Sequence, residues 1–425
     1  MMPTHRLLKK GVPFGAILFA CLLFTAFSSL AQESPKDSVV ETDLPTLLFK
    51  KKKETIVDSA MMITPQGKIK LAVLPVVGYN PANGFVFGAA ISGSTMLGNP
   101  ATTRQSSGLI NATLTTKEQM IIIGRAGLAF EGNKYLVDID TRLLIFTQDT
   151  YGLGTKTGKE GASNYAQAQP MTFNYFRFFL NGYRRISDEL YAGAGIAIEN
   201  HSKIVDVNLN IDSVPFNYTS HYNYSTQHGF PLTKYKTNGL FLAIKWDSRD
   251  NIANPYTGWF ASMAGNFNMP WLGSNKSSFM FNLDGRYYLN VQKSRPSHLV
   301  AFWLRGNFST EGKIPYLALP ATSWDTYNRT GRGYIQGRFR GPAMAYFETE
   351  YRYPITRNGL LGGVAFANFT STSGNGQKLF EAVAPAAGVG LRIKLDKASR
   401  ANITVDYARG AAGSSGIFFN LQEAF

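Results

Sequence analysis

Cysteine and histidine are scarce in this sequence of 425 residues, which holds one Cys and five His. The single cysteine, Cys21, lies in an N-terminal apolar segment, so disulfides, thiolate metal sites and Cys nucleophiles are excluded from the rest of the chain. His221 and His228 have no acid or thiol beside them at ligand spacing. No G-x-S-x-G nucleophile elbow occurs. We therefore predict no metal, no cofactor and no enzymatic activity.

Apolar residues are too few for a bundle of membrane helices, at 44% of the chain, while Gly (41), Phe (30) and Tyr (21) are abundant. Strands with one lipid-facing and one wet face give this balance. An apolar run from Val12 to Leu30 follows three basic residues and ends at a small-residue cleavage pattern. We predict a signal peptide over residues 1–31. The alternatives are a retained anchor helix and lipid attachment at Cys21.

Acidic residues are outnumbered, with 28 Asp and Glu against 43 Lys and Arg, for a formal net charge of +15. Removal of the predicted signal peptide would leave 15 − 3 = +12. In an exported membrane protein such an excess indicates anionic lipid headgroups or an anion-favouring lumen, so we expect no nucleic-acid partner. Residues 32–68 are polar, include four consecutive lysines and are interpreted as a short periplasmic tail.

From residue 69 to the end the dominant pattern has a period of two. In residues 134–147, for example, Tyr135, Val137 and Ile139 fall on one face, and Asp138 and Asp140 fall on the other. Successive side chains of a strand point to opposite sides, so the pattern predicts strands with an apolar wall and a charged wall. Because it recurs over some 350 residues in an exported chain, we predict an all-β transmembrane barrel over residues 69–425.

Sixteen strands are predicted, an even number as single-chain outer-membrane barrels require. They cover residues 69–78, 84–97, 104–115, 119–130, 134–147, 171–184, 189–201, 237–247, 258–270, 277–292, 297–309, 343–355, 360–370, 382–395, 400–409 and 415–424. Three long connections, 148–170, 202–236 and 310–342, follow the fifth, seventh and eleventh strands. All three therefore lie at one end, which is the outer end if both chain termini are periplasmic.

The connection 310–342 is unusually rich in arginine and glycine. Arg329, Arg332, Arg338 and Arg340 fall within twelve residues of one another, and the next strand would point Glu348 and Glu350 into the lumen. Guanidinium groups pair bidentately with carboxylates, so this connection could fold inward and be held there. The alternative is a basic surface loop that contacts anionic glycolipid, with the glutamates paired across strands.

The C-terminal segment has the pattern of a last amphipathic strand. Ile417, Phe419, Leu421 and Phe425 share one face of a continuous strand, and Phe425 is the last residue of the sequence. A terminal aromatic residue on such a strand looks like the signal that outer-membrane barrels present to their assembly machinery.

Several segments resemble the bacterial surface antigen barrels of the BamA/TamA type. They are GYNPANGFVFG at 78–88, YGLG at 151–154, WDSRDNIANPYTG at 246–258, the stretch from GRGY to EYRYP at 331–354, and the C-terminal region. The resemblance of the segment 331–354 implies an inward-folded loop that is held in place by Arg332, Gly333 and Tyr334. The turn motif carries Asp247, Arg249, Asp250 and Gly258.

The resemblance implies a sixteen-stranded barrel in which Arg332 meets lumen acids, with Glu350 matching the strand carboxylate of the family. A second family acid, in a pattern like F-x-D-x-G, is replaced by Asn368 in the stretch FANF. We therefore expect Arg332 to form its ion pair in the lumen with Glu350, Glu348 or Asp406. The 37 residues from 32 to 68 are too few for a POTRA domain, so we expect a stand-alone barrel.

Three functions follow from these observations, all in a bacterial outer membrane. The first, favoured by the resemblance, is assembly, insertion or translocation of outer-membrane proteins. The second is a passive, anion-favouring channel. The third is a structural subunit that holds another envelope protein. Outer-membrane lipids are expected partners in every case, and other outer-membrane or periplasmic proteins in the first and third.

Overall fold

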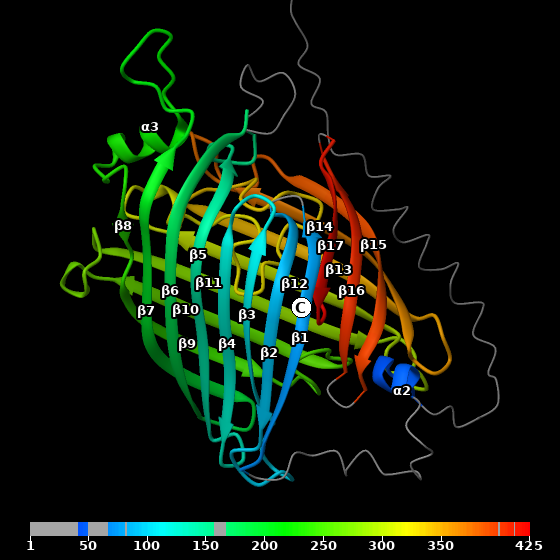
Figure 1. Cartoon of the computed structure of the whole chain (residues 1–425). Helices are drawn as coiled ribbons and strands as arrows, with labels where there is room; N and C mark the ends of the chain where they lie inside the picture. The colour runs from blue at the N-terminus through cyan, green and yellow to red at the C-terminus, as the bar shows by residue number, and fades with distance from the viewer. Residues whose placement is uncertain (1–40, 50–66, 81–82, 157–166, 398–399, 412) are drawn as a thin grey trace, which may run out of the picture. The chain divides into compact units, whose positions relative to one another are not determined.

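The computed structural model of the chain describes residues 41–49, 67–80, 83–156, 167–397, 400–411 and 413–425. The predicted signal peptide and the four-lysine run lie outside these residues. The described part has two kinds of short helix and a single large sheet (Figure 1). The α-helices are α2 (Leu44–Phe49) and α3 (Ser220–Gln227), and the 3-10 helices are η3 (Pro270–Leu272) and η4 (Tyr316–Ala318). No helix in these ranges is long and apolar enough to cross a membrane.

Seventeen strands occur in the described residues, and apart from the two-residue β8 they are sixteen long strands. The first nine are β1 (Ile69–Asn80), β2 (Gly84–Thr95), β3 (Ser106–Thr115), β4 (Met120–Phe130), β5 (Tyr135–Thr150), β6 (Gln169–Arg185), β7 (Leu190–Asp206), β8 (Tyr235–Lys236) and β9 (Gly239–Asp247). The others are β10 (Gly258–Asn268), β11 (Ser278–Asn290), β12 (Leu299–Ser309), β13 (Ala343–Pro354), β14 (Leu361–Thr372), β15 (Ala384–Asp396), β16 (Ala401–Gly410) and β17 (Ser415–Leu421). The predicted sixteen-strand, all-β architecture is confirmed, and no strand end differs from its predicted position by more than five residues.

Alternation of side chains explains why these segments form strands with two different faces. In β13 the even-numbered residues from Met344 to Arg352 are buried, whereas Phe347 and Tyr351 are exposed. Large apolar side chains are similarly exposed on β1–β3, β5, β9–β11 and β14–β17. An outward apolar wall of this kind is stable against lipid, and the charged inner face is then satisfied by pairing within the interior.

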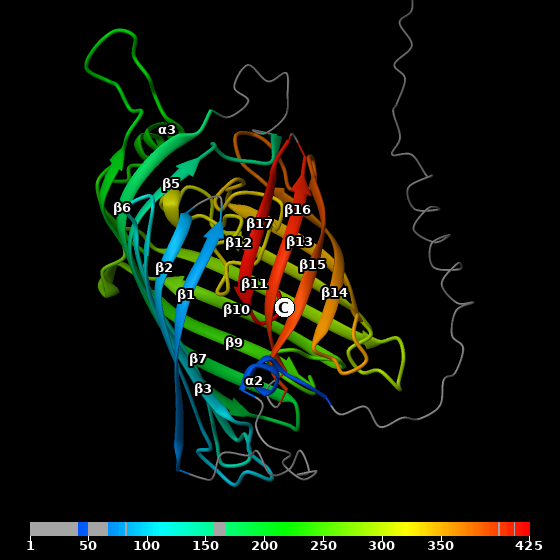
Figure 2. The same cartoon turned by 45° about the vertical axis from the view of Figure 1, so that its right-hand side comes forward.

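Strand pairing follows the chain order. Each long strand pairs antiparallel with the next, β7 pairs directly with β9, and β8 adds two residues to β7. The sheet curves around an interior, as the two views show (Figures 1 and 2). β1 and β17 are near neighbours in space, but no ladder register joins them within the described residues. We call the line where β1 and β17 meet the seam.

The interior of the curved sheet is crossed by residues 310–342, which we call the lumen loop (Figure 2). Apolar packing is concentrated where this loop meets the long connections. Two hydrogen bonds join the same parts: the Tyr224 hydroxyl of α3 donates to the Ile314 carbonyl at 2.9 Å, and the Tyr235 hydroxyl accepts from Leu317 N at 3.0 Å. Both contacts are buried. The predicted inward-folded loop is therefore present, and the connection between β7 and β9 packs on it.

Candidate functional site

The lumen loop touches the inner faces of strands on two sides of the sheet. Arg142 of β5 donates to the carbonyls of Asp325 and Thr326 at 3.2 and 2.8 Å. Trp324 donates from its indole nitrogen to Gln148 Oε1 at 3.2 Å. On the other side, Arg329 donates to the Leu421 carbonyl at the end of β17, at 2.7 Å. The loop thus spans the interior from β5 to β17.

Asp325 gives the loop its local shape. Its carboxylate accepts from Arg329 N at 3.0 Å, from Thr330 N at 2.9 Å and from the Thr330 hydroxyl at 2.7 Å. These bonds close a tight turn immediately before Arg332. Gly333 has φ +102°, and a Cβ there would lie 2.8 Å from the Cβ of Ala386. Only glycine fits that backbone conformation in that space.

Arg332 ends in a group of three carboxylates from two strands. Its Nε and Nη2 reach the two oxygens of Glu348 at 3.2 and 2.5 Å, and Nη1 reaches Asp406 Oδ2 at 2.8 Å. Nη2 also pairs with Glu350 Oε1. The guanidinium carbon lies 3.6 Å from the centroid of the Phe366 ring. All four charged side chains are buried. Since a buried charge is costly without partners, this cluster fixes the loop against β13 and β16.

Asn368 of β14 contacts the same cluster. Its Nδ2 donates to the Arg332 carbonyl at 2.9 Å and points to Glu348 Oε2 at 3.4 Å. The side chain is fully buried. An amide can donate here, whereas an ionised carboxylate could only accept. Asn368 therefore adds a donor, and the negative charge is supplied by Glu348, Glu350 and Asp406.

The other loop residues singled out from the sequence bind different parts of the interior. The Tyr334 hydroxyl donates to the Pro385 carbonyl at 2.6 Å and accepts from Ala411 N at 2.9 Å. The guanidinium of Arg338 lies over the Tyr151 ring at 4.4 Å. Arg340 donates to three carbonyls near η4, including that of Leu317 at 2.7 Å. Arg332 thus binds the buried acids, whereas Arg340 binds backbone carbonyls.

The acid cluster continues into residues that the motif analysis missed. Arg352 Nε donates to Glu350 at 2.6 Å, and Arg392 Nη1 donates to Asp406 at 2.5 Å. Glu423 accepts from Arg392 Nε at 2.7 Å, which links the end of the chain to β15. Both arginines occupy even-numbered positions, which are the buried positions around them in β13 and β15. Nothing in the sequence indicated Glu423, because it was placed within a continuous last strand.

The C-terminal residues correct one prediction. Ile417, Phe419 and Leu421 are exposed on the outer face, but Phe425 is buried at 4% exposure, so the four residues do not share a face. β17 ends at Leu421, and Gln422 has φ +68°. This turn sends the last residues inward, where the Phe425 ring lies 5.2 Å from that of Trp303. Arg352 Nη2 donates to the Phe425 O atom at 3.0 Å.

The turn motif at 246–258 stabilises the opposite end of the sheet from the long connections. Asp247 accepts from Arg249 Nε at 2.8 Å and from Arg104 Nη1 at 3.0 Å. Burial alone would lower the pKa of the Arg249 guanidinium, but Asp247 raises this pKa above its ordinary value. Asp250 accepts from Tyr256 N at 2.9 Å and from Arg400 Nη1 at 2.5 Å.

Gly258 completes this motif at φ +104°, with the Ser248 carbonyl 2.4 Å from where a Cβ would lie. The four motif residues thus serve turn geometry and ion pairing. In the described ranges, no group of three or more His, Cys, Asp or Glu side chains is arranged to hold a metal ion.

Comparisons with known proteins agree with this architecture. Residues 144–421 match the model of the Omp85 superfamily domain. Among solved structures, the chain is similar to BamA from Haemophilus ducreyi lacking POTRA domains 1–3, with a TM-score of 0.53, 12% identity, and coverage of 84% of this chain and 69% of that one. It is also similar to CdiB from Acinetobacter baumannii, with a TM-score of 0.48, 12% identity, and coverage of 92% and 73%. The comparison with curated proteins finds no match.

Proposed function

The chain belongs to the Omp85 superfamily, and from this premise we propose that it is a bacterial outer-membrane β-barrel that assembles, inserts or translocates envelope proteins. Its predicted resemblance to BamA/TamA-type barrels is confirmed by the family match, and the similarity to BamA supports the fold. The specific role is our inference, as are its outer-membrane location and its lack of catalytic activity.

The seam is the observation that carries this proposal. β1 pairs with β2 on one side, and its other edge lies beside β17, where no ladder register is formed within the described residues. Pro75 lies in the middle of β1 and has no backbone N–H, a feature found on edge strands. β17 is only seven residues long, against twelve in β1. An exposed backbone edge is a template for pairing with another strand. The seam could therefore receive a strand of a client protein.

The lumen loop supports this function over that of an open pore. It spans the interior from β5 to β17 and is held there by buried ion pairs. A passive channel needs an unobstructed path, so the channel hypothesis predicts a large steady conductance. Our proposal predicts low or flickering currents in planar bilayer recordings.

Two linked experiments test the proposal. The chain is depleted in its native cell, and the outer-membrane proteome is quantified. Purified protein in liposomes is then tested for acceleration of the folding of an unfolded outer-membrane barrel. We expect a selective fall in other barrel proteins and faster folding. Unchanged outer-membrane protein levels together with unaccelerated folding would refute the proposal. Stoichiometric co-purification with one envelope protein in that case would instead indicate the structural-subunit role.

A further inference from the structure

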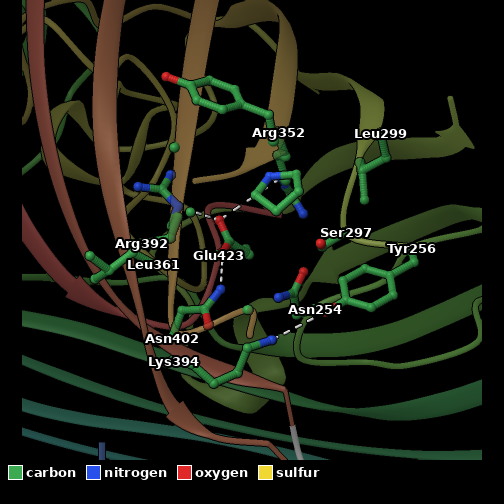
Figure 3. Close-up of a pocket in the computed structure, with 15 residues that line it drawn as sticks. Asn254, Tyr256, Ser297, Leu299, Arg352, Leu361, Arg392, Lys394, Asn402 and Glu423 are labelled. Carbon is green, nitrogen blue, oxygen red and sulfur yellow. Dashed lines mark hydrogen bonds and ion pairs between the residues drawn. The ribbon is translucent and has the colours of Figure 1, made fainter. Parts of the chain in front are cut away.

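A small pocket opens among the ends of the five strands β12 to β16, next to the 246–258 turn (Figure 3). Arg392 and Lys394 reach it from β15, where they are two residues apart and so on the same face. Arg352 enters from β13, and Tyr256 and Ser297 line the side across from β15. Glu423 is the only acidic residue of the lining. Three cations therefore surround one carboxylate.

Lys394 has no charged partner in this pocket. Its Nζ contacts the Tyr256 hydroxyl at 3.2 Å, and no carboxylate of the described residues lies within ion-pair distance of it. The side chain is nevertheless buried, with 7% of its surface exposed. A buried ammonium group without a counter-charge is costly. The position thus favours a negative group that the chain itself does not supply.

The two arginines of the pocket, Arg352 and Arg392, each have a guanidinium nitrogen that makes no hydrogen bond. Arg352 and Arg392 are 5% and 4% exposed, yet Arg352 Nη1 and Arg392 Nη2 are buried without a hydrogen-bond partner. Their other nitrogens are used by Glu350, Asp406 and Glu423. Two unused guanidinium nitrogens and one ammonium group together offer charge-assisted donors for oxygen atoms.

We propose that this pocket binds a small oxyanion, either a carboxylate or a phosphate group, between Lys394 and the two arginines. Carboxylate and phosphate oxygens match guanidinium and ammonium donors in charge and geometry. A cation would be repelled by the three basic side chains. The inference does not depend on the proposed assembly function, because it rests only on the pocket's own residues.

Calorimetry on the full chain in an uncharged maltoside detergent tests the site, with inorganic phosphate and acetate as probes at constant ionic strength. The wild type should bind at least one of them at a single site. Lys394→Met should weaken this binding about tenfold, because it removes a buried charge-assisted donor. The matched control is Lys245→Met, which removes a buried lysine already paired with Asp138 at 3.0 Å, and it should leave binding unchanged.

A second variant keeps the test decisive if Lys394→Met does not fold. Ser297→Glu places a carboxylate on the pocket wall and leaves all three cations intact, so it should abolish oxyanion binding in folded protein. A stronger response to phosphate or to acetate identifies which group the pocket prefers. The proposal is overturned if neither probe binds the wild type, if Lys245→Met weakens binding as much as Lys394→Met, or if folded Ser297→Glu binds like the wild type.

Discussion

At the scale of single residues, Arg332 is the main link between the lumen loop and the wall. It pairs with Glu348 and Asp406 at 2.5 and 2.8 Å, and all three side chains are buried. Arg332→Met would leave buried carboxylates without a counter-charge, so we expect a loss of about 3–5 kcal/mol of unfolding free energy. The loop should also become sensitive to protease. Arg338→Met is the control, since Arg338 stacks on Tyr151 at 4.4 Å away from the acids. Equal protease resistance in both variants would contradict the role given to Arg332.

Asn368 allows a second test at this scale. Its amide donates to the Arg332 carbonyl at 2.9 Å and faces Glu348. In Asn368→Asp an ionised carboxylate would face a carbonyl and a second carboxylate, so the variant should lose about 1–3 kcal/mol of unfolding free energy at neutral pH. A protonated carboxyl can donate, and the loss should therefore shrink as the pH is lowered. A variant as stable as the wild type at neutral pH would show that the donor is not needed.

At the scale of elements, the 246–258 turn depends on glycine in a crowded position. Gly258 has φ +104°, and an added Cβ would lie 2.4 Å from the Ser248 carbonyl. Gly258→Ala should therefore cost about 1–3 kcal/mol of unfolding free energy. Gly359→Ala is the matched control, because Gly359 has φ +68° with nothing within 4 Å of its added Cβ. The alanine at 258 should cost clearly more, and equal losses by urea unfolding would contradict the crowding argument.

The docking of α2 should depend on pH. Asp43 accepts from Thr46 N at 3.0 Å and from Lys397 N at 3.2 Å. Burial alone would raise the pKa of the Asp43 carboxyl, but hydrogen bonds from Thr46 and Lys397 lower it below its ordinary value. A lowered folded-state pKa contributes stability above the unfolded value, about pH 4, and this stability is lost as the pH falls through the folded pKa.

Hydrogen exchange at Leu44–Phe49 measures this docking. Protection should be constant from neutral pH to about pH 4 and should fall below it. Asp43→Asn should lower protection at neutral pH and remove the acid-dependent step. An acid-dependent step of the same size in the variant would assign the titration to another group.

At the scale of the whole molecule, period-two alternation was sufficient to predict the sheet. In β13 every buried residue is even-numbered from Met344 to Arg352, so the inner face could be identified from the sequence. The Arg332 cluster could be anticipated only through the family resemblance, since the sequence alone left a surface loop equally open. Phe425 could not be placed correctly, because the chain leaves the strand at Gln422, where φ is positive, and Glu423, Ala424 and Phe425 all turn into the interior.

The proposed function depends most directly on the seam, because a client strand can enter only if β1 and β17 separate there. Amide hydrogen exchange of the full chain in lipid nanodiscs measures this edge strand by strand. We predict that amides of β1 and β17 exchange at least about tenfold faster than those of β13 and β14, which are paired on both sides. Equal protection of β1, β17, β13 and β14 would show a fully hydrogen-bonded seam and would contradict the proposed route for client strands.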